Sequence, residues 1–193
     1  NANTKIMVYD LDANGLPTGT PTSISIPDIT SASAITSLAV DPLYLYVVDS
    51  KLGDVHIFKL SNNTYYGKLS AKSTPTFTFP ADNKQLDDIV VSPTIGTGLN
   101  THWNIYVSSL KESGKVFVFT QWMSGHAYMG SINNLYRPGQ LALSADNKFL
   151  AVAINKDTPQ NSTDVALFNI ENISESALTN GLSPAKNISA NAN

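Results

Sequence analysis

Residues 139–170 read GQLALSADNKFLAVAINKDTPQNSTDVALFNI, and this stretch is the unit that the rest of the chain repeats. Its apolar and β-branched runs predict three strands, QLALS, FLAVAIN and DVALFNI. Residues 145–148 (ADNK) favour a turn, because Asp and Asn side chains bond nearby backbone groups and tolerate left-handed geometry. Pro159 lies in the polar stretch 156–163, through which no strand can run. The segment therefore predicts three strands joined by a tight turn and a polar loop.

Two earlier copies of this unit precede it. In each copy three strands align with those of 139–170: ITSLAVDP, LYLYVVD and VHIFKL (35–42, 43–49, 55–60), then LDDIVVSP, WNIYVSS and GKVFVFT (86–93, 103–109, 114–120). We expect a fourth strand at the proline-bounded PTFTFP (75–80) in the first copy and around 126–132 in the second. Four antiparallel strands in about 45 residues is the size of one β-propeller blade.

The third strands show the repeat best. VHIFKL, VFVFTQ and VALFNI, together with IMVYDL near the N-terminus, carry an aromatic residue at the fourth position: Phe58, Phe119, Phe168 and Tyr9. Self-similarity at a spacing of about 50 residues indicates a repeat fold. In a blade, alternate residues of this strand would pack on the two neighbouring blades.

These strand pairs carry a family resemblance. ALSADNKFLAVAIN…DVALFNI and VDPLYLYVVDSKLGDVHIFKL resemble the repeat of lactonase-like β-propellers of the Tyr-Val-Thr-Asn type, over most of residues 4–172. The turn departs from that repeat, since ADNK stands where the family has Pro-Asp-Gly-Lys. The resemblance implies the fold but not the function, because such propellers serve as enzymes, binders and scaffolds alike.

The sequence thus predicts an all-β chain of about 3.5 four-stranded blades. Its expected parts are a propeller segment over 1–175, made of a partial blade (4–28) and blades 35–80, 86–132 and 137–190 with a short last strand near 187–190, and a polar tail over 176–193. Propellers close with roughly four to eight blades. Three interpretations remain open: a fragment of a longer propeller, a half completed by a second chain or a second copy into a seven-bladed ring, or a compact β fold of another kind.

Composition narrows the function classes. The net charge is −3, with 12 Lys and Arg scattered among 15 Asp and Glu, which argues against nucleic-acid binding. The absence of Cys excludes disulfides, zinc–thiolate sites and thiol catalysis. No run approaches the roughly 18 apolar residues of a membrane span. A surface rich in Ser, Thr and Asn and a start at Asn1 favour an extracellular, cell-surface or periplasmic protein that has lost a signal peptide, or a piece of a longer protein.

In a propeller, sites gather where first strands begin and second strands end. The polar residues expected there, at the channel or its rim, are Asp49, Asp87, Asp88, Ser109, Arg137, Gln140 and Asn155. Asp87 and Asp88, converging with an Asn, offer the oxygen ligands that Ca²⁺ prefers. The resemblance implies metal or acid–base residues around the channel, yet the only Glu residues, Glu112, Glu171 and Glu175, fall in loops. The alternative is that the two Asp residues cap a turn or solubilise a strand entrance, with no cofactor.

Other motifs are weaker. His56, His102 and His126 show no metal-ligand spacing, and a general-base role for His102 competes with a structural one. Neither a Gly-x-Ser-x-Gly elbow nor a P-loop occurs. Four Asn-x-Ser/Thr sequons begin at Asn62, Asn161, Asn172 and Asn187. The cluster WMSGHAYM (122–129) could recognise a partner or pack over a blade edge.

The leading hypothesis is a non-catalytic secreted or cell-surface propeller module for binding or assembly, completed by a second protein chain or by self-association. One alternative is a lactonase-like hydrolase with a metal or acid–base site in the channel. Another is a subunit of an extracellular filament or multi-protein complex, in which the tail completes a neighbour's blade.

Overall fold

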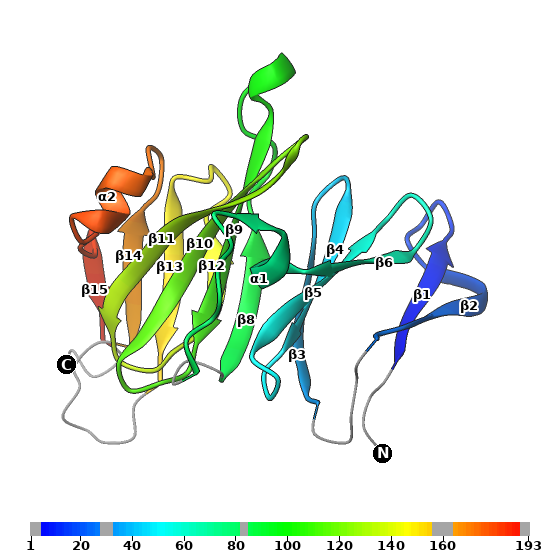
Figure 1. Cartoon of the computed structure of the whole chain (residues 1–193), viewed down its shortest axis with the longest axis horizontal. Helices are drawn as coiled ribbons and strands as arrows, with labels where there is room; N and C mark the ends of the chain where they lie inside the picture. Colours follow the sequence, from blue (N-terminus) through cyan, green and yellow to red (C-terminus); the bar gives the residue numbers. More distant parts are fainter. Residues whose placement is uncertain (1–4, 28–32, 82–84, 156–163, 190–193) are drawn as a thin grey trace.

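The computed structural model describes residues 5–27, 33–81, 85–155 and 164–189, and their strands form four sheets (Figure 1). An N-terminal hairpin pairs β1 (Lys5–Leu11) with β2 (Pro17–Ser25). Three larger sheets follow, here called blades I, II and III; each has four antiparallel strands, and blade II carries a short fifth strand at its edge. Within each set of four, strands adjacent in sequence are adjacent in the sheet.

The blades have these members. Blade I consists of β3 (Ile35–Val40), β4 (Tyr44–Asp49), β5 (Asp54–Lys59) and β6 (Thr64–Lys68). Blade II consists of β8 (Leu86–Val91), β9 (His102–Ser109), β10 (Gly114–Trp122) and β11 (Gly125–Leu135), and the short β7 (Ser73–Thr74) pairs in parallel with β11. Blade III consists of β12 (Pro138–Leu143), β13 (Phe149–Ile154), β14 (Val165–Asn169) and β15 (Lys186–Ile188). The helical turns are α1 (Leu69–Lys72), η2 (Gly98–Asn100) and α2 (Glu175–Thr179).

Successive sheets pack face to face, with an apolar core between each pair. On β5, Val55 and Ile57 enter the core shared with blade II, whereas Phe58 enters the core shared with the N-terminal hairpin. On β10, Phe117 and Phe119 face blade I, whereas Val116 and Val118 face blade III. Alternate residues of a strand point to opposite faces, so both faces of blades I and II are apolar. This confirms the predicted alternation and an all-β partial propeller, with the hairpin and blade III at opposite ends in Figure 1.

The predicted fourth strand of blade I at 75–80 is wrong. The fourth strand is β6, which follows a tight turn in which Asn63 adopts a positive φ of 55°. Residues 75–79 form no strand; the rings of Phe77 and Phe79 instead fill the core between blades I and II. Prolines cannot donate to a strand ladder, so an irregular segment suits this stretch. The other two expected fourth strands are confirmed as β11 and β15.

Part of the stretch expected as a polar tail belongs to blade III. The Ser174 hydroxyl caps α2 by accepting a hydrogen bond from the Ala177 N–H, and Leu178 is buried in the core between blades II and III. β15 then pairs with β14. The helix is only five residues long, which is too short to produce a helical period in the sequence. None of the helices in the described ranges is both long enough and apolar enough to cross a membrane.

Candidate functional site

Asp88, on the first strand of blade II, joins all three blades at the position expected for the channel. Its Oδ1 accepts a hydrogen bond from the Ser37 hydroxyl of β3 at 2.5 Å, and its Oδ2 accepts one from the Leu141 N–H of β12 at 2.8 Å. The side chain is buried. Hydrogen bonds to an ionised acceptor are stronger than neutral ones, and these two cross between sheets. Asp88 therefore fixes the innermost strands relative to one another.

The same contacts oppose the calcium site that the Asp87–Asp88 pair suggests. Oδ1 of Asp88 also accepts from the Ile89 N–H at 2.9 Å, so donors surround both carboxylate oxygens. A cation would need those lone pairs. Across the described ranges, no three His, Cys, Asp or Glu side chains are grouped so that they could hold a metal ion. The residues present therefore do not fit Ca²⁺ through Asp88.

Asp87 and Asn155 meet over Gly139 at the rim where first strands begin. A Cβ built at Gly139 would lie 2.2 Å from Asn155 Nδ2 and 3.3 Å from Asp87 Oδ2, so glycine is what allows both side chains to approach. The amide of Asn155 also donates to the Arg137 carbonyl at 3.2 Å. Burial, and then the neighbouring Asp88, raise the pKa of Asp87. The structure thus brings together three of the predicted rim residues, Asp87, Arg137 and Asn155.

The remaining rim candidates are Asp49, Ser109 and Gln140. Asp49 is fully buried and its Oδ1 accepts from the N–H groups of Ala34 and Leu52 at 3.2 and 3.0 Å, so it shapes the turn that follows β4. Ser109 is fully buried, and Gln140 is exposed on β12. The site expectation for these three stays a prediction.

Two of the three histidines are structural in character. His56 is buried with its Nε2 3.9 Å from Asp49 Oδ2. His126 is buried at the interface of blades I and II, where its Nε2 lies 3.0 Å from the Tyr46 hydroxyl, which in turn donates to Asp41 Oδ2 at 2.7 Å. Burial, aided by the Lys72 charge, lowers the pKa of His126 to about 4, so it is neutral at pH 7. The sequence does not predict this series of contacts from Asp41 through Tyr46 to His126, because the residues are up to 85 positions apart and share no motif.

Side chains of the other motifs are placed as follows. In the 122–129 cluster, Met123 is exposed, while Tyr128 stacks on Phe77 with ring centroids 4.0 Å apart. Packing therefore accounts for Tyr128. Three sequon residues, Asn62, Asn172 and Asn187, are exposed, and Asn161 lies outside the described residues. Their glycosylation stays a prediction.

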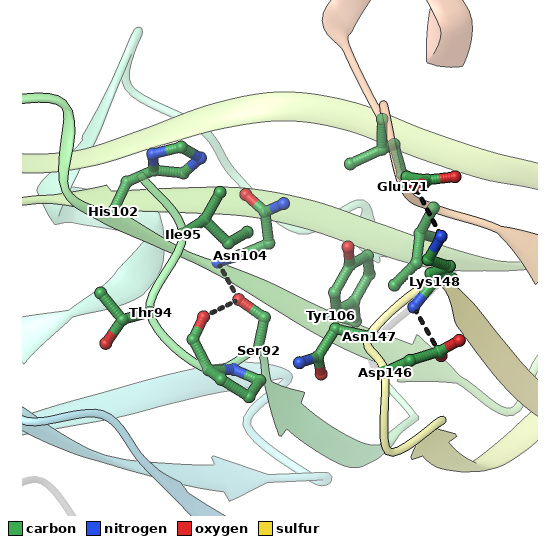
Figure 2. Close-up of a pocket in the computed structure, with 13 residues that line it drawn as sticks. Ser92, Thr94, Ile95, His102, Asn104, Tyr106, Asp146, Asn147, Lys148 and Glu171 are labelled. Atoms are coloured by element: carbon green, nitrogen blue, oxygen red, sulfur yellow. Dashed lines mark hydrogen bonds and ion pairs between the residues drawn. The ribbon is translucent and has the colours of Figure 1, made fainter. Parts of the chain in front are cut away.

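A cavity of about 330 Å³ opens at the other end of the same strands, between blades II and III (Figure 2). Its walls are the end of β8 with the loop after it, the start of β9, the turn 145–148 and the loop after β14. The sequence marks 145–148 as a turn. It gives no sign that this turn faces β9 of the preceding blade, because that contact depends on how two repeats stack.

Comparisons with known proteins support the fold. No family profile and no curated protein sequence matches the chain. Among solved structures, Kuenenia stuttgartiensis hydrazine synthase is 17% identical with a TM-score of 0.54, over 86% of this chain and 40% of that one. The Pseudomonas aeruginosa periplasmic gluconolactonase is 17% identical with a TM-score of 0.54, over 97% and 51%. The dihydro-heme d1 dehydrogenase NirN is 9% identical with a TM-score of 0.56, over 98% and 34%.

At these identities the likeness shows the fold alone. The chain spans between about a third and about half of the length of these proteins. This agrees with a partial propeller. The particular repeat type suggested by the sequence stays a proposal.

Proposed function

We propose that this chain is a non-catalytic β-propeller module for binding or assembly, which works as one half of a ring completed by further blades. The observation that carries the proposal is that no described residue covers one apolar face of each end sheet, although the equivalent faces between sheets are buried. An uncovered blade face of this kind marks an interaction surface.

The N-terminal face belongs to the hairpin. Ile6 and Val8 of β1 pack against blade I, so Met7 and Tyr9 point the other way, and these are 49% and 46% exposed. In the described part of the chain, β1 pairs with β2 alone. Its second edge therefore presents backbone groups that can pair with another strand.

The C-terminal face belongs to blade III. Leu150 and Phe168 form a cross-strand pair inside the core, so the adjacent pair Ala151 and Leu167 lies on the outer face. On the same face, Phe149 and Ile188 are 37% and 42% exposed. In blades I and II, the equivalent positions pack on the next sheet.

The two ends call for different occupants. β1 and β2 correspond in pattern to the third and fourth strands of a blade, so the free edge of β1 suits a segment that supplies the first two strands. The outer face of blade III suits a complete blade. A propeller segment that begins with a full blade and ends on two strands would satisfy both and lock the ring. Such a segment belongs either to the same protein or to a second chain, and in its absence the uncovered faces of separate copies should associate with one another.

We place this module outside the cytoplasm. The support is a sequence low in charge, with 14% Asp, Glu, Lys and Arg, and the fold likeness to a gluconolactonase described as periplasmic. Detection of the mature protein in periplasmic or secreted fractions of its host would test this placement.

The test of assembly uses one substitution on the outer face of blade III. Leu167→Asp places a charge on this face and should weaken association at least tenfold, because an unpaired charge would be buried in the contact. Leu99→Asp is the matched control, since Leu99 is fully exposed in η2, away from both end faces. Analytical ultracentrifugation of both variants and the parent gives the association constants. Equal association of all three proteins would contradict the proposal.

A lactonase-like hydrolase is the second candidate. It is favoured by the placement of Asp87, with its raised pKa, beside Asn155 at the rim of the channel. The purified protein would then hydrolyse a sugar lactone, and Asp87→Asn would abolish this activity while the fold is retained. Hydrolysis that is absent, or unaffected by Asp87→Asn, would remove this candidate.

The filament alternative receives less support. It requires the C-terminal stretch to complete a neighbour's blade, yet Leu178 is buried in the protein's own core and β15 pairs with β14. As far as residue 189, this stretch is already used within blade III.

A further inference from the structure

The cavity between blades II and III lies at the opposite end of the strands from Asp87 and Asn155. Ser92, Thr94 and His102 line it from blade II, and Asn147 and Lys148 line it from the turn of blade III. Figure 2 shows Asn147 and Lys148 close to Tyr106, whereas the side chain of Thr94 points away from them. A volume of about 330 Å³ is at the lower end of the range for small-molecule pockets, about 300–1,000 Å³.

Tyr106 supplies a buried polar atom without a partner at this cavity. The side chain is fully buried, and its hydroxyl has no hydrogen bond to any described residue. In the view of Figure 2 the hydroxyl lies between the side chains of Asn104 and Lys148. Burial raises the pKa of Tyr106, and a weak contact with the Asn104 side chain opposes this only in part, so the hydroxyl keeps its proton and can donate. An unpaired buried hydroxyl is costly, and a ligand oxygen in the cavity would satisfy it.

The other polar groups of the lining are neutral hydrogen-bonding groups. The Asn104 side-chain oxygen accepts from Thr120, which leaves its NH₂ group as the donor. The Thr94 hydroxyl accepts from the Trp103 indole N–H at 3.1 Å and points away from the cavity in Figure 2. His102 Nδ1 faces the Asn100 carbonyl at 2.8 Å, which places the proton there and makes Nε2 the acceptor. Donors and an acceptor thus converge without net charge.

Of the three charged groups of the lining, Lys148 and Glu171 are paired with each other, and Asp146 is held by uncharged donors. Lys148 Nζ lies 2.9 Å from Glu171 Oε1. Asp146 accepts from the Ser144 hydroxyl at 2.6 Å and from the Lys148 N–H at 3.1 Å. An anionic ligand would have to displace Glu171, and a cationic ligand would have to displace Lys148. The lining therefore favours a ligand without charge.

Apolar side chains complete the cavity. Ile95, Ile170 and Ile173 line it together with the polar groups. A ligand that fits both must carry several hydroxyl groups and a C–H face. We propose that this cavity binds a small, neutral, polyhydroxylated molecule of the monosaccharide class, with Tyr106 as the central hydrogen-bond donor. The inference does not depend on ring completion, because every lining residue belongs to blades II and III or the loops next to them.

The test is a binding screen on the full 193-residue protein by saturation-transfer NMR. The neutral probes are the methyl α- and β-glycosides of glucose, galactose and mannose, and the charged probes are glucuronate and glucosamine. We expect at least one neutral glycoside to bind at millimolar concentration or below, and the charged probes to bind more weakly. Binding of no neutral glycoside, or equal binding of the charged probes, overturns the proposal.

Two variants and one control locate the binding. Tyr106→Phe removes only the buried hydroxyl and should weaken binding of the neutral glycoside about tenfold, with unfolding stability unchanged or raised. Tyr9→Phe makes the same chemical change on an exposed side chain of β1 and should leave binding unchanged. His102→Phe keeps the ring stacked on Trp122, where the centroids are 4.4 Å apart, and should also weaken binding. Binding that survives both Tyr106→Phe and His102→Phe overturns the proposal.

Discussion

At the scale of single residues, Asp88 decides how the blades are held at the channel. Its carboxylate accepts hydrogen bonds from Ser37 and Leu141, which are 51 and 53 positions away in the chain. The sequence marks Asp88 as a polar residue on a first strand, and that placement is confirmed. Its partners could not be predicted, because a serine hydroxyl and a backbone N–H belong to no motif. A single repeat also does not determine how neighbouring blades are aligned.

Replacing Asp88 tests this role. Asp88→Asn turns one acceptor oxygen into an NH₂ donor that faces other donors, so we expect a loss of about 2–3 kcal/mol in the free energy of unfolding. Urea denaturation measures the loss. Asp87→Asn is the matched neighbour, and it should cost little because no described residue donates to Asp87. Equal destabilisation by the two variants would contradict the three-blade role of Asp88.

The raised pKa of Asp87 predicts how the stability of the Asp87→Asn variant, relative to the parent, depends on pH. A raised pKa in the folded state means that the fold disfavours the charged carboxylate, so the penalty is present at neutral pH and absent below the ordinary value of 3.8. Asp87→Asn should therefore be as stable as the parent, or more stable, at pH 7, and equal to it at about pH 3. A variant less stable than the parent at pH 7 would show instead that the charge is favoured.

His126 predicts the opposite pH response. Its pKa falls from 6.5 to about 4 on folding, so the unfolded chain binds a proton that the folded chain does not. Stability from this residue is complete above pH 6.5 and declines as the pH falls towards 4, by up to about 3 kcal/mol. His126→Gln keeps an N–H for Tyr46 but does not titrate. We expect urea unfolding to show that the difference in unfolding free energy between parent and variant changes by this amount from pH 7 to pH 4. A difference that stays constant with pH would contradict the lowered pKa of His126.

At the scale of elements, alternation in the third strands predicted which faces are buried, whereas fourth strands and helices were harder to predict. Phe58 and Phe119 each pack on the neighbour that alternation assigns to them. The fourth strand at 75–80 was wrong because the aromatics Phe77 and Phe79 alternate as they would in a strand, although they fill a core from an irregular segment. α2 was missed because its buried side consists of little more than Leu178.

Leu178 shows how far α2 contributes to the core. It is 2% exposed and packs against Gly130, where an added Cβ would lie 2.9 Å from the Leu178 Cβ. Leu178→Ala should destabilise the protein by about 2–4 kcal/mol, the usual cost of a cavity in a core. Leu99→Ala, at a fully exposed position, should change the free energy of unfolding by less than about 0.5 kcal/mol. Comparable effects in thermal unfolding would mean that α2 is not part of the folded core.

At the scale of the whole molecule, the sequence predicted a partial ring of blades but not how that ring is completed. Repeats of one pattern reveal that each blade is apolar on both faces, since alternate positions of the same strand are apolar. The repeat pattern does not say what covers the outer faces of the hairpin and blade III, so the sequence leaves the completion of the ring open. The structure adds two unequal ends among the described residues, a two-stranded hairpin and a complete blade, which together define the shape that the proposed completing segment would need.

The mass of the protein in solution tests this account most directly. The chain has a mass of 20.7 kDa, and we predict that light scattering and native mass spectrometry will find it in heavier, concentration-dependent species, or bound to a protein that supplies further blades. Association would follow from two uncovered apolar faces and an open strand edge. A stable, monodisperse monomer of 20.7 kDa over the whole concentration range would contradict the half-ring.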